Sequence, residues 1–176
     1  LFVSDSKHSR VRRVGTDADR TISNYAGTGI AGFGGDGGPA SSARLHTPMG
    51  LWGDTIGNLY VTDAVSSVVR CISRHTLLIH TVAGTAAAAG YSGDGGLAVR
   101  ARLDNPLAVW GDAWSQLYVA DTYNKAVRLL STTTQLPTGA PTAKPSTAPS
   151  AAPSVRPTGP SVSPSRHPTV SPPVTP

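Results

Sequence analysis

The sequence predicts an all-β fold built from a repeated unit, and three observations support this prediction. All ten acidic residues are Asp, and the chain contains 19 glycines; Asp and Gly favour turns, whereas Glu would favour helices. Short runs of β-branched and aromatic residues are separated by clusters of Gly, Asp, Asn and Ser, and no stretch shows a 3.6-residue period. A long segment of the chain also occurs twice.

The repeat defines the structural unit. Residues 32–70 align with residues 90–128 at a shift of 58 positions, and 19 of the 39 aligned residues are identical, as expected of a repeat architecture. The same frame reaches back to LFVSD at residues 1–5. Strand-like runs lie at 49–53, 59–62, 68–72 and 78–83, and they recur at 107–111, 117–120 and 126–130. We therefore predict a partial β-propeller of two four-stranded blades plus part of a third.

The composition divides the chain near Pro137. Residues 1–136 hold all ten aromatic residues and every acidic residue, which suits one domain, the propeller fragment with 58-residue repeats. Residues 137–176 hold twelve of the 15 prolines and 13 Ser or Thr. This segment has nothing to nucleate a core, so we predict a disordered Pro/Ser/Thr-rich stalk or linker. Such stalks are typical of secreted or wall-associated proteins, and we expect an extracellular or cell-surface location.

Charge and cysteine content narrow the function classes. The first 136 residues carry twelve basic and ten acidic residues, an excess too small to indicate nucleic-acid binding. Cys71 is the sole cysteine, so no intramolecular disulfide or thiolate metal site is expected. Residues 1–176 show no 18-residue apolar run and no signal-peptide pattern. Because Leu1 already stands in a strand-like pattern, we expect the natural N-terminus to lie further upstream.

The string at residues 26–72, AGTGIAGFGGDGGPASSARLHTPMGLWGDTIGNLYVTDAVSSVVRCI, resembles the NHL-repeat β-propeller family. In that pattern a Gly-Asp-Gly-Gly loop precedes a Leu-x-x-Pro strand and then Gly-Asn-Leu-Tyr-Val-x-Asp. The resemblance covers residues 1–130, and similar loops occur in the teneurin propeller. Departures are Trp52, Trp110 and the Ser66–Ser67 turn. The resemblance implies a non-catalytic scaffold that binds protein or glycan partners.

Three Asp–Arg pairs recur with a spacing of seven residues. A residue present in every blade usually holds the blade together, so we predict inter-strand or inter-blade ion pairs that offset each other's desolvation. The residues are Asp5 with Arg12, Asp63 with Arg70, and Asp121 with Arg128.

The Gly-Asp-Gly-Gly loops supply a further pair in each copy. Arg44 and Arg102 stand eight residues after Asp36 and Asp94, which predicts an Asp–Arg clamp. A cation at Asp36 or Asp94 is the alternative, although calcium takes six to eight oxygen ligands and each loop offers one carboxylate. GTGIAG at 27–32 matches a dinucleotide-binding pattern, but no helix start follows it, so no cofactor is expected.

Two other function classes stay open. Propellers that resemble metal-dependent lyases or lactonases hold a metal with ligands from several blades, and blades outside this sequence could supply them. The basic run SRVRRV, with Arg10, Arg12 and Arg13, would suit an RNA-binding NHL propeller. In each case further blades, from upstream or from other chains, are needed to close the ring, because open sheet edges are a liability.

Overall fold

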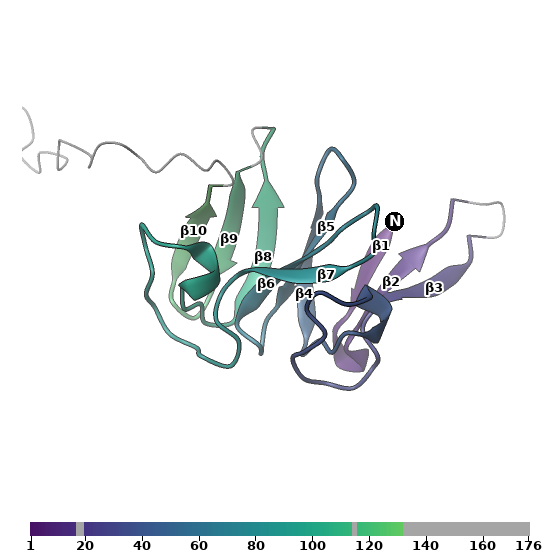
Figure 1. The fold of residues 1–176 in the computed structure, drawn as a ribbon, viewed down its shortest axis with the longest axis horizontal. Coiled ribbons are helices and arrows are strands. Elements are labelled where there is room, and N and C mark those ends of the chain that lie inside the picture. The colour runs from purple at the N-terminus through teal and green to yellow at the C-terminus, as the bar shows by residue number, and fades with distance from the viewer. Residues whose placement is uncertain (17–19, 114–115, 132–176) are drawn as a thin grey trace, which may run out of the picture. The chain divides into compact units, whose positions relative to one another are not determined.

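The computed structural model describes residues 1–16, 20–113 and 116–131, which form three antiparallel sheets (Figure 1). The first contains β1 (Phe2–Asp5), β2 (Arg10–Val14) and β3 (Ile22–Ala26). The second contains β4 (Pro48–Gly53), β5 (Leu59–Asp63), β6 (Val68–Ile72) and β7 (Ile79–Ala83). The third contains β8 (Pro106–Gly111), β9 (Leu117–Asp121) and β10 (Ala126–Leu130). The predicted all-β fold, a partial β-propeller, is confirmed.

Short 3-10 helices lie in the connections between strands. They are η1 (Ser6–His8), η2 (Ala40–Ser42) and η3 (Ala98–Arg100). Within the described ranges, no helix has the length and apolar character needed to cross a membrane.

Each strand pairs with the strand that follows it in its sheet, so the strand order is sequential (Figure 1). β4 lies beside both β1 and β8, and through it the second sheet contacts its two neighbours. The approach of β4 to β8 requires Gly50, because a Cβ atom there would lie 2.7 Å from the Cα of Ala108. The three sheets are therefore consecutive blades that meet along one side.

The seven strand ranges predicted from the repeat match β4 to β10 to within one residue at each end. The number of strands per sheet differs from the prediction, because the described residues contain one four-stranded sheet between two three-stranded sheets. The predicted stalk at 137–176 lies outside the described residues.

The hydrophobic core lies between neighbouring sheets. Val11 and Ala26 of the first sheet pack against the second, on Leu59, Val61, Ile72 and Ile79. Val69 and Ala83 of the second sheet belong to the next cluster, with Leu103, Val109, Leu117, Val119 and Leu130. Each sheet thus has a trailing face, which we define by the equivalent residues Val11, Val69 and Val127. This face packs on the following blade in the first two sheets, whereas Val127 of the third sheet is exposed.

Candidate functional site

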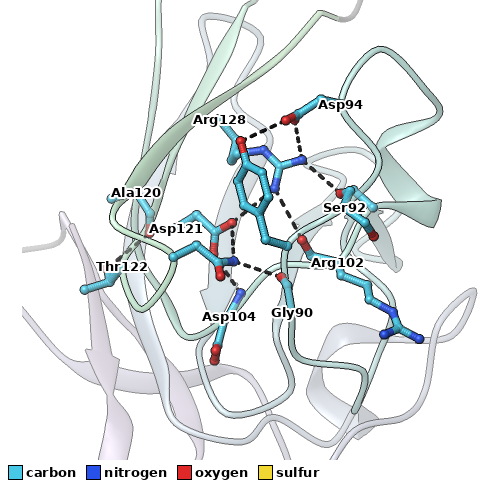
Figure 2. A network of polar contacts seen from close by, with 12 residues as sticks. Gly90, Ser92, Asp94, Arg102, Asp104, Ala120, Asp121, Thr122 and Arg128 are labelled. Carbon is cyan, nitrogen blue, oxygen red and sulfur yellow. Dashed lines mark hydrogen bonds and ion pairs between the residues drawn. The ribbon is translucent and has the colours of Figure 1, made fainter.

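The Gly-rich loop of the second repeat folds over Arg128, which β10 supplies (Figure 2). The Arg128 side chain is only 8% exposed, and its guanidinium lies 2.5 Å from Asp94 Oδ1 and 3.2 Å from Asp121 Oδ2. It also donates hydrogen bonds to the carbonyl oxygens of Ser92 and Arg102. These acceptors replace the water that the buried cation has lost.

An aromatic ring covers the same arginine. The centroid of the Tyr91 ring lies 4.7 Å from Arg128 Cζ, which is within cation–π range. The Tyr91 hydroxyl donates a 2.9 Å hydrogen bond to Asp94 Oδ2. This hydrogen bond, together with the Arg128 charge, lowers the pKa of Asp94. The same hydrogen bond and the negative charge of Asp94 raise the pKa of Tyr91. Tyr91 nevertheless stays 58% exposed, so the loop presents an aromatic side chain to solvent.

The first Gly-rich loop makes the same arrangement around Arg70 of β6. Arg70 is fully buried and pairs with Asp36 Oδ1 at 2.5 Å. It donates further hydrogen bonds to the carbonyl oxygens of Gly34 and Arg44. The Phe33 ring centroid lies 5.0 Å from Arg70 Cζ, where Tyr91 stands in the other copy. Each Gly-rich loop is therefore held over its sheet by its own buried arginine, Arg70 or Arg128.

The predicted Asp36–Arg44 and Asp94–Arg102 clamps are not formed, and this part of the prediction is wrong. Each loop aspartate pairs with the strand arginine, Arg70 or Arg128. The backbone of Arg44 forms an isolated antiparallel bridge with Gly34, and its carbonyl accepts from Arg70. Figure 2 shows the equivalent Arg102 side chain directed away from the network. A spacing of eight residues brings these backbones together but turns the arginine side chains outward.

The Asp–Arg pairs with a spacing of seven residues are in contact in two sheets. Asp5 lies 3.5 Å from Arg12, and Asp121 lies 3.2 Å from Arg128. Among the described residues Asp63 has no ion pair with Arg70, whose guanidinium binds Asp36 instead.

Asp63 is fully buried and incompletely satisfied. Its Oδ1 accepts a 2.7 Å hydrogen bond from the backbone N–H of His46, while its Oδ2 has no hydrogen-bond partner. Burial raises the pKa of Asp63 to about 6, although the hydrogen bond from His46 acts in the opposite direction.

The loop aspartates were also candidate cation ligands. Both oxygens of Asp36 already accept hydrogen bonds, from Arg70 and from the backbone N–H of Thr81. Burial raises the pKa of Asp36, but the hydrogen bonds from Thr81 and Arg70 outweigh it and the net shift is downward. In the part of the chain that the structure describes, no three His, Cys or Asp side chains gather as metal ligands.

The arginines of the run SRVRRV have different surroundings. Arg10 donates to the carbonyl oxygen of Thr28, and Arg12 pairs with Asp5. Arg13 is exposed and borders a cleft at the outer edge of the first sheet. The sequence prediction also missed the aromatic rings over the buried arginines. The signal for them was present, because Phe33 and Tyr91 occupy equivalent positions of the repeat.

Comparison with known proteins supports the resemblance of the repeat to NHL repeats. No family model matches the chain. The chain is 28% identical over 142 residues to NHL repeat-containing protein 2 of Homo sapiens, a match that covers 77% of this chain. This similarity supports the resemblance of the repeat to the NHL-repeat family. It spans only 19% of the length of that relative.

Solved structures share the fold of this chain. A structural genomics protein of unknown function from Bacteroides thetaiotaomicron matches with a TM-score of 0.65 and 23% identity. An auxiliary nutrient binding protein from the same organism matches with a TM-score of 0.60 and 17% identity. Both matches cover 73% of this chain, and they cover 31% and 33% of the respective solved chains. The repeats described here therefore correspond to about a third of each of those molecules.

Proposed function

We propose that the chain is a run of consecutive blades of a non-catalytic NHL propeller that binds protein or glycan partners at or outside the cell surface. The observation that carries this proposal is the way the Gly-rich loops are held. Each loop is fixed by a buried arginine and exposes an aromatic ring, Phe33 at 40% and Tyr91 at 58%. Loops on a rigid scaffold that expose aromatic side chains are suited to recognition.

The neighbouring turns add exposed side chains at the same end of the sheets. The Asn124 side-chain amide donates a 2.8 Å hydrogen bond to the Gly90 carbonyl, which joins the β9–β10 turn to the loop. Tyr123 in this turn is 66% exposed, and the equivalent Val65 is 51% exposed. We call Phe33, Val65, Tyr91 and Tyr123 together the loop-end surface. A solved structure with this fold is described as an auxiliary nutrient binding protein, which is consistent with a binding role.

We further propose that additional blades cover the trailing face of the third sheet. Val69 is fully buried by the sheet that follows it, whereas the equivalent Val127 is 73% exposed. Trp110 is 57% exposed, while the equivalent Trp52 packs against the core of the third sheet. An apolar face of this kind indicates an interaction surface. In the full-length protein, Val127→Asp and Val69→Asp should both lower the melting temperature. An unchanged melting temperature of Val127→Asp would contradict the proposal that a further blade covers Val127.

The binding proposal is tested with full-length protein on arrays of glycans and of immobilised extracellular proteins. We expect saturable binding that Tyr123→Ala weakens and that changes little with salt. Ile56→Ser, an exposed position on the β4–β5 turn, serves as the matched control. Circular dichroism of each variant checks the fold. The absence of saturable binding on both arrays would overturn the proposal, and a steep fall of RNA affinity with salt would favour the RNA-binding alternative.

A further inference from the structure

A cleft of about 490 Å³ lies between the outer parts of the first and second sheets. Three segments line it: the β2–β3 hairpin, η2, and the turn between β6 and β7. Its volume falls within the range of roughly 300 to 1,000 Å³ that is usual for small-ligand sites. The polar and aromatic side chains that border it include Arg13, Ser23, Tyr25, Ser41 and Thr76.

The walls of this cleft are joined by backbone hydrogen bonds and a ring contact. The Gly27 N–H donates to the Ala40 carbonyl, and the Ala40 N–H donates to the Leu77 carbonyl, each at 2.9 Å. These bonds tie the β2–β3 hairpin to η2 and tie η2 to the β6–β7 turn. The Tyr25 ring packs on Phe2, with their centroids 4.6 Å apart. The cleft is therefore pre-formed, which lowers the entropic cost of binding.

The side chains of the cleft do not follow the repeat. The positions equivalent to Arg13, Tyr25 and Ser41 at the next blade junction are occupied by Cys71, Val82 and Val99. That junction is nevertheless packed in the same way, with the Gly84 N–H bonded to the Ala98 carbonyl as Gly27 is bonded to Ala40. The blade contact therefore does not need an arginine, a tyrosine or a serine at these positions. Residues that recur in every repeat stabilise the contacts between blades. Arg13, Tyr25 and Ser41 occur together at only this one of the two described junctions.

The chemistry of the cleft suits an anion that carries hydroxyl groups. Arg13 is exposed, and it has no ion pair with any acidic residue that the structure describes. No residue that lines the cleft is acidic. Burial raises the pKa of Tyr25, and the charges of Arg13 and Arg74 act in the opposite direction. A guanidinium binds a carboxylate or sulfate through paired hydrogen bonds, and serine hydroxyls match the hydroxyls of a sugar.

We propose that this cleft binds an acidic saccharide, with Arg13 holding its carboxylate or sulfate and with Tyr25, Ser23 and Ser41 lining the sugar ring. This inference rests on the proposed binding function and names the ligand class of one site. The loop-end surface is a different part of the molecule and is free to bind another partner.

Isothermal titration calorimetry of the full-length protein tests this site with three probes: trigalacturonate, a chondroitin sulfate tetrasaccharide and neutral galactotriose. We expect at least one acidic probe to bind about tenfold or more tightly than galactotriose, because a charge-assisted pair contributes at least a factor of that order. The acidic probe that binds more tightly tells whether the anionic group is a carboxylate or a sulfate. Equal affinity for acidic and neutral probes, or no binding of any probe, overturns the inference.

Variants locate the binding in the cleft. Arg13→Gln should weaken the acidic probe about tenfold or more, and Arg13→Lys should lie in between because it keeps the charge but loses the paired donors. Ser41→Val introduces the residue of the other junction and should weaken binding less. Arg100→Gln, an exposed arginine of η3, should leave affinity unchanged. If an acidic probe binds equally well to Arg13→Gln, the ligand is not held in this cleft, but the proposed binding function stands. The binding function itself fails if no saturable ligand is found on the glycan and protein arrays described above.

Discussion

The second and third sheets carry the same repeated Asp and Arg residues, but the ion pairs between these residues differ. Arg70 is fully buried and takes its carboxylate from the loop, so Asp63 is left with one unpaired oxygen. Arg128 is 8% exposed and binds both Asp94 and Asp121. One residue that does not repeat contributes to this difference, because Asn124 donates to Asp121 Oδ2 where the second sheet has Ser66. Equal spacing in sequence therefore does not ensure equal pairing.

Removing the buried cation should have the largest effect. Arg70→Gln leaves the Asp36 carboxylate and two carbonyl oxygens without their donor, and breaking a buried pair in this way destabilises a protein by about 3 to 5 kcal/mol. We expect Arg128→Gln to destabilise as well, because it leaves the buried Asp121 carboxylate without its counter-charge, although the Asp104 N–H and the Asn124 amide still donate to it. Urea unfolding of the chain measures both. Arg44→Gln is the control. If it lowered the free energy of unfolding as much as Arg70→Gln does, an Asp36–Arg44 ion pair would have to form after all.

The pH dependence separates Asp63 from the other aspartates. Its pKa in the folded state, about 6, exceeds its ordinary value of 3.8, so between these values the folded state binds more protons than the unfolded state. The contribution of Asp63 to the free energy of unfolding is therefore full below pH 4 and is lost as pH rises through 6. Relative to Asp63→Asn, the wild-type chain should lose up to about 3 kcal/mol between pH 4 and pH 8.

Comparing unfolding curves of the wild type and Asp63→Asn at several pH values makes this measurement. The loop aspartates respond in the opposite direction, since the pKa values of Asp36 and Asp94 are lowered, but they are common to both proteins and cancel. A difference that does not change with pH would show that Asp63 is not protonated in the folded state near pH 5.

Exchanging the residue that does not repeat should make the third sheet resemble the second. Asn124→Ser removes hydrogen bonds to Asp121 Oδ2 and to the Gly90 carbonyl, and we expect a loss of about 1 to 2 kcal/mol. Thermal unfolding gives the change. Thr122→Ser, in the same turn, keeps its hydroxyl and serves as control. An Asn124→Ser variant as stable as the wild type would mean that Asn124 does not stabilise the turn.

The smallest effect is expected at the exposed ring. Tyr91→Phe reproduces the aromatic side chain of the other copy and removes the hydrogen bond to Asp94, which is the largest of the effects that lower the pKa of that carboxyl. The pKa of Asp94, followed by NMR titration, should rise while the fold is kept. No change in this pKa would show that the Arg128 charge alone holds it low.

The sequence was sufficient to predict most of the fold. The repeat located β4 to β10 because each copy carries its own turns and β-branched runs, and packing between copies preserves that pattern. The ion-pair partners of Asp36 and Asp94 could not be predicted, since the loop turns back at glycines with positive φ such as Gly35 and Gly93. The cleft could not be predicted either, because Arg13 and Thr76 are distant in sequence and meet only where two sheets adjoin.

The sequential strand order has a consequence for how such a protein can change over evolutionary time. Within each described sheet, every strand pairs with its neighbour in the chain. The first sheet packs on the second, and the second packs on the third, through equivalent faces. In such an array, stability is approximately a sum of unit and nearest-neighbour contributions. A genetic duplication of one 58-residue unit would therefore add a complete blade whose faces already fit both neighbours. The cleft between the first and second sheets would not be copied by a duplication elsewhere, because its polar residues occur at that junction alone among the described ones.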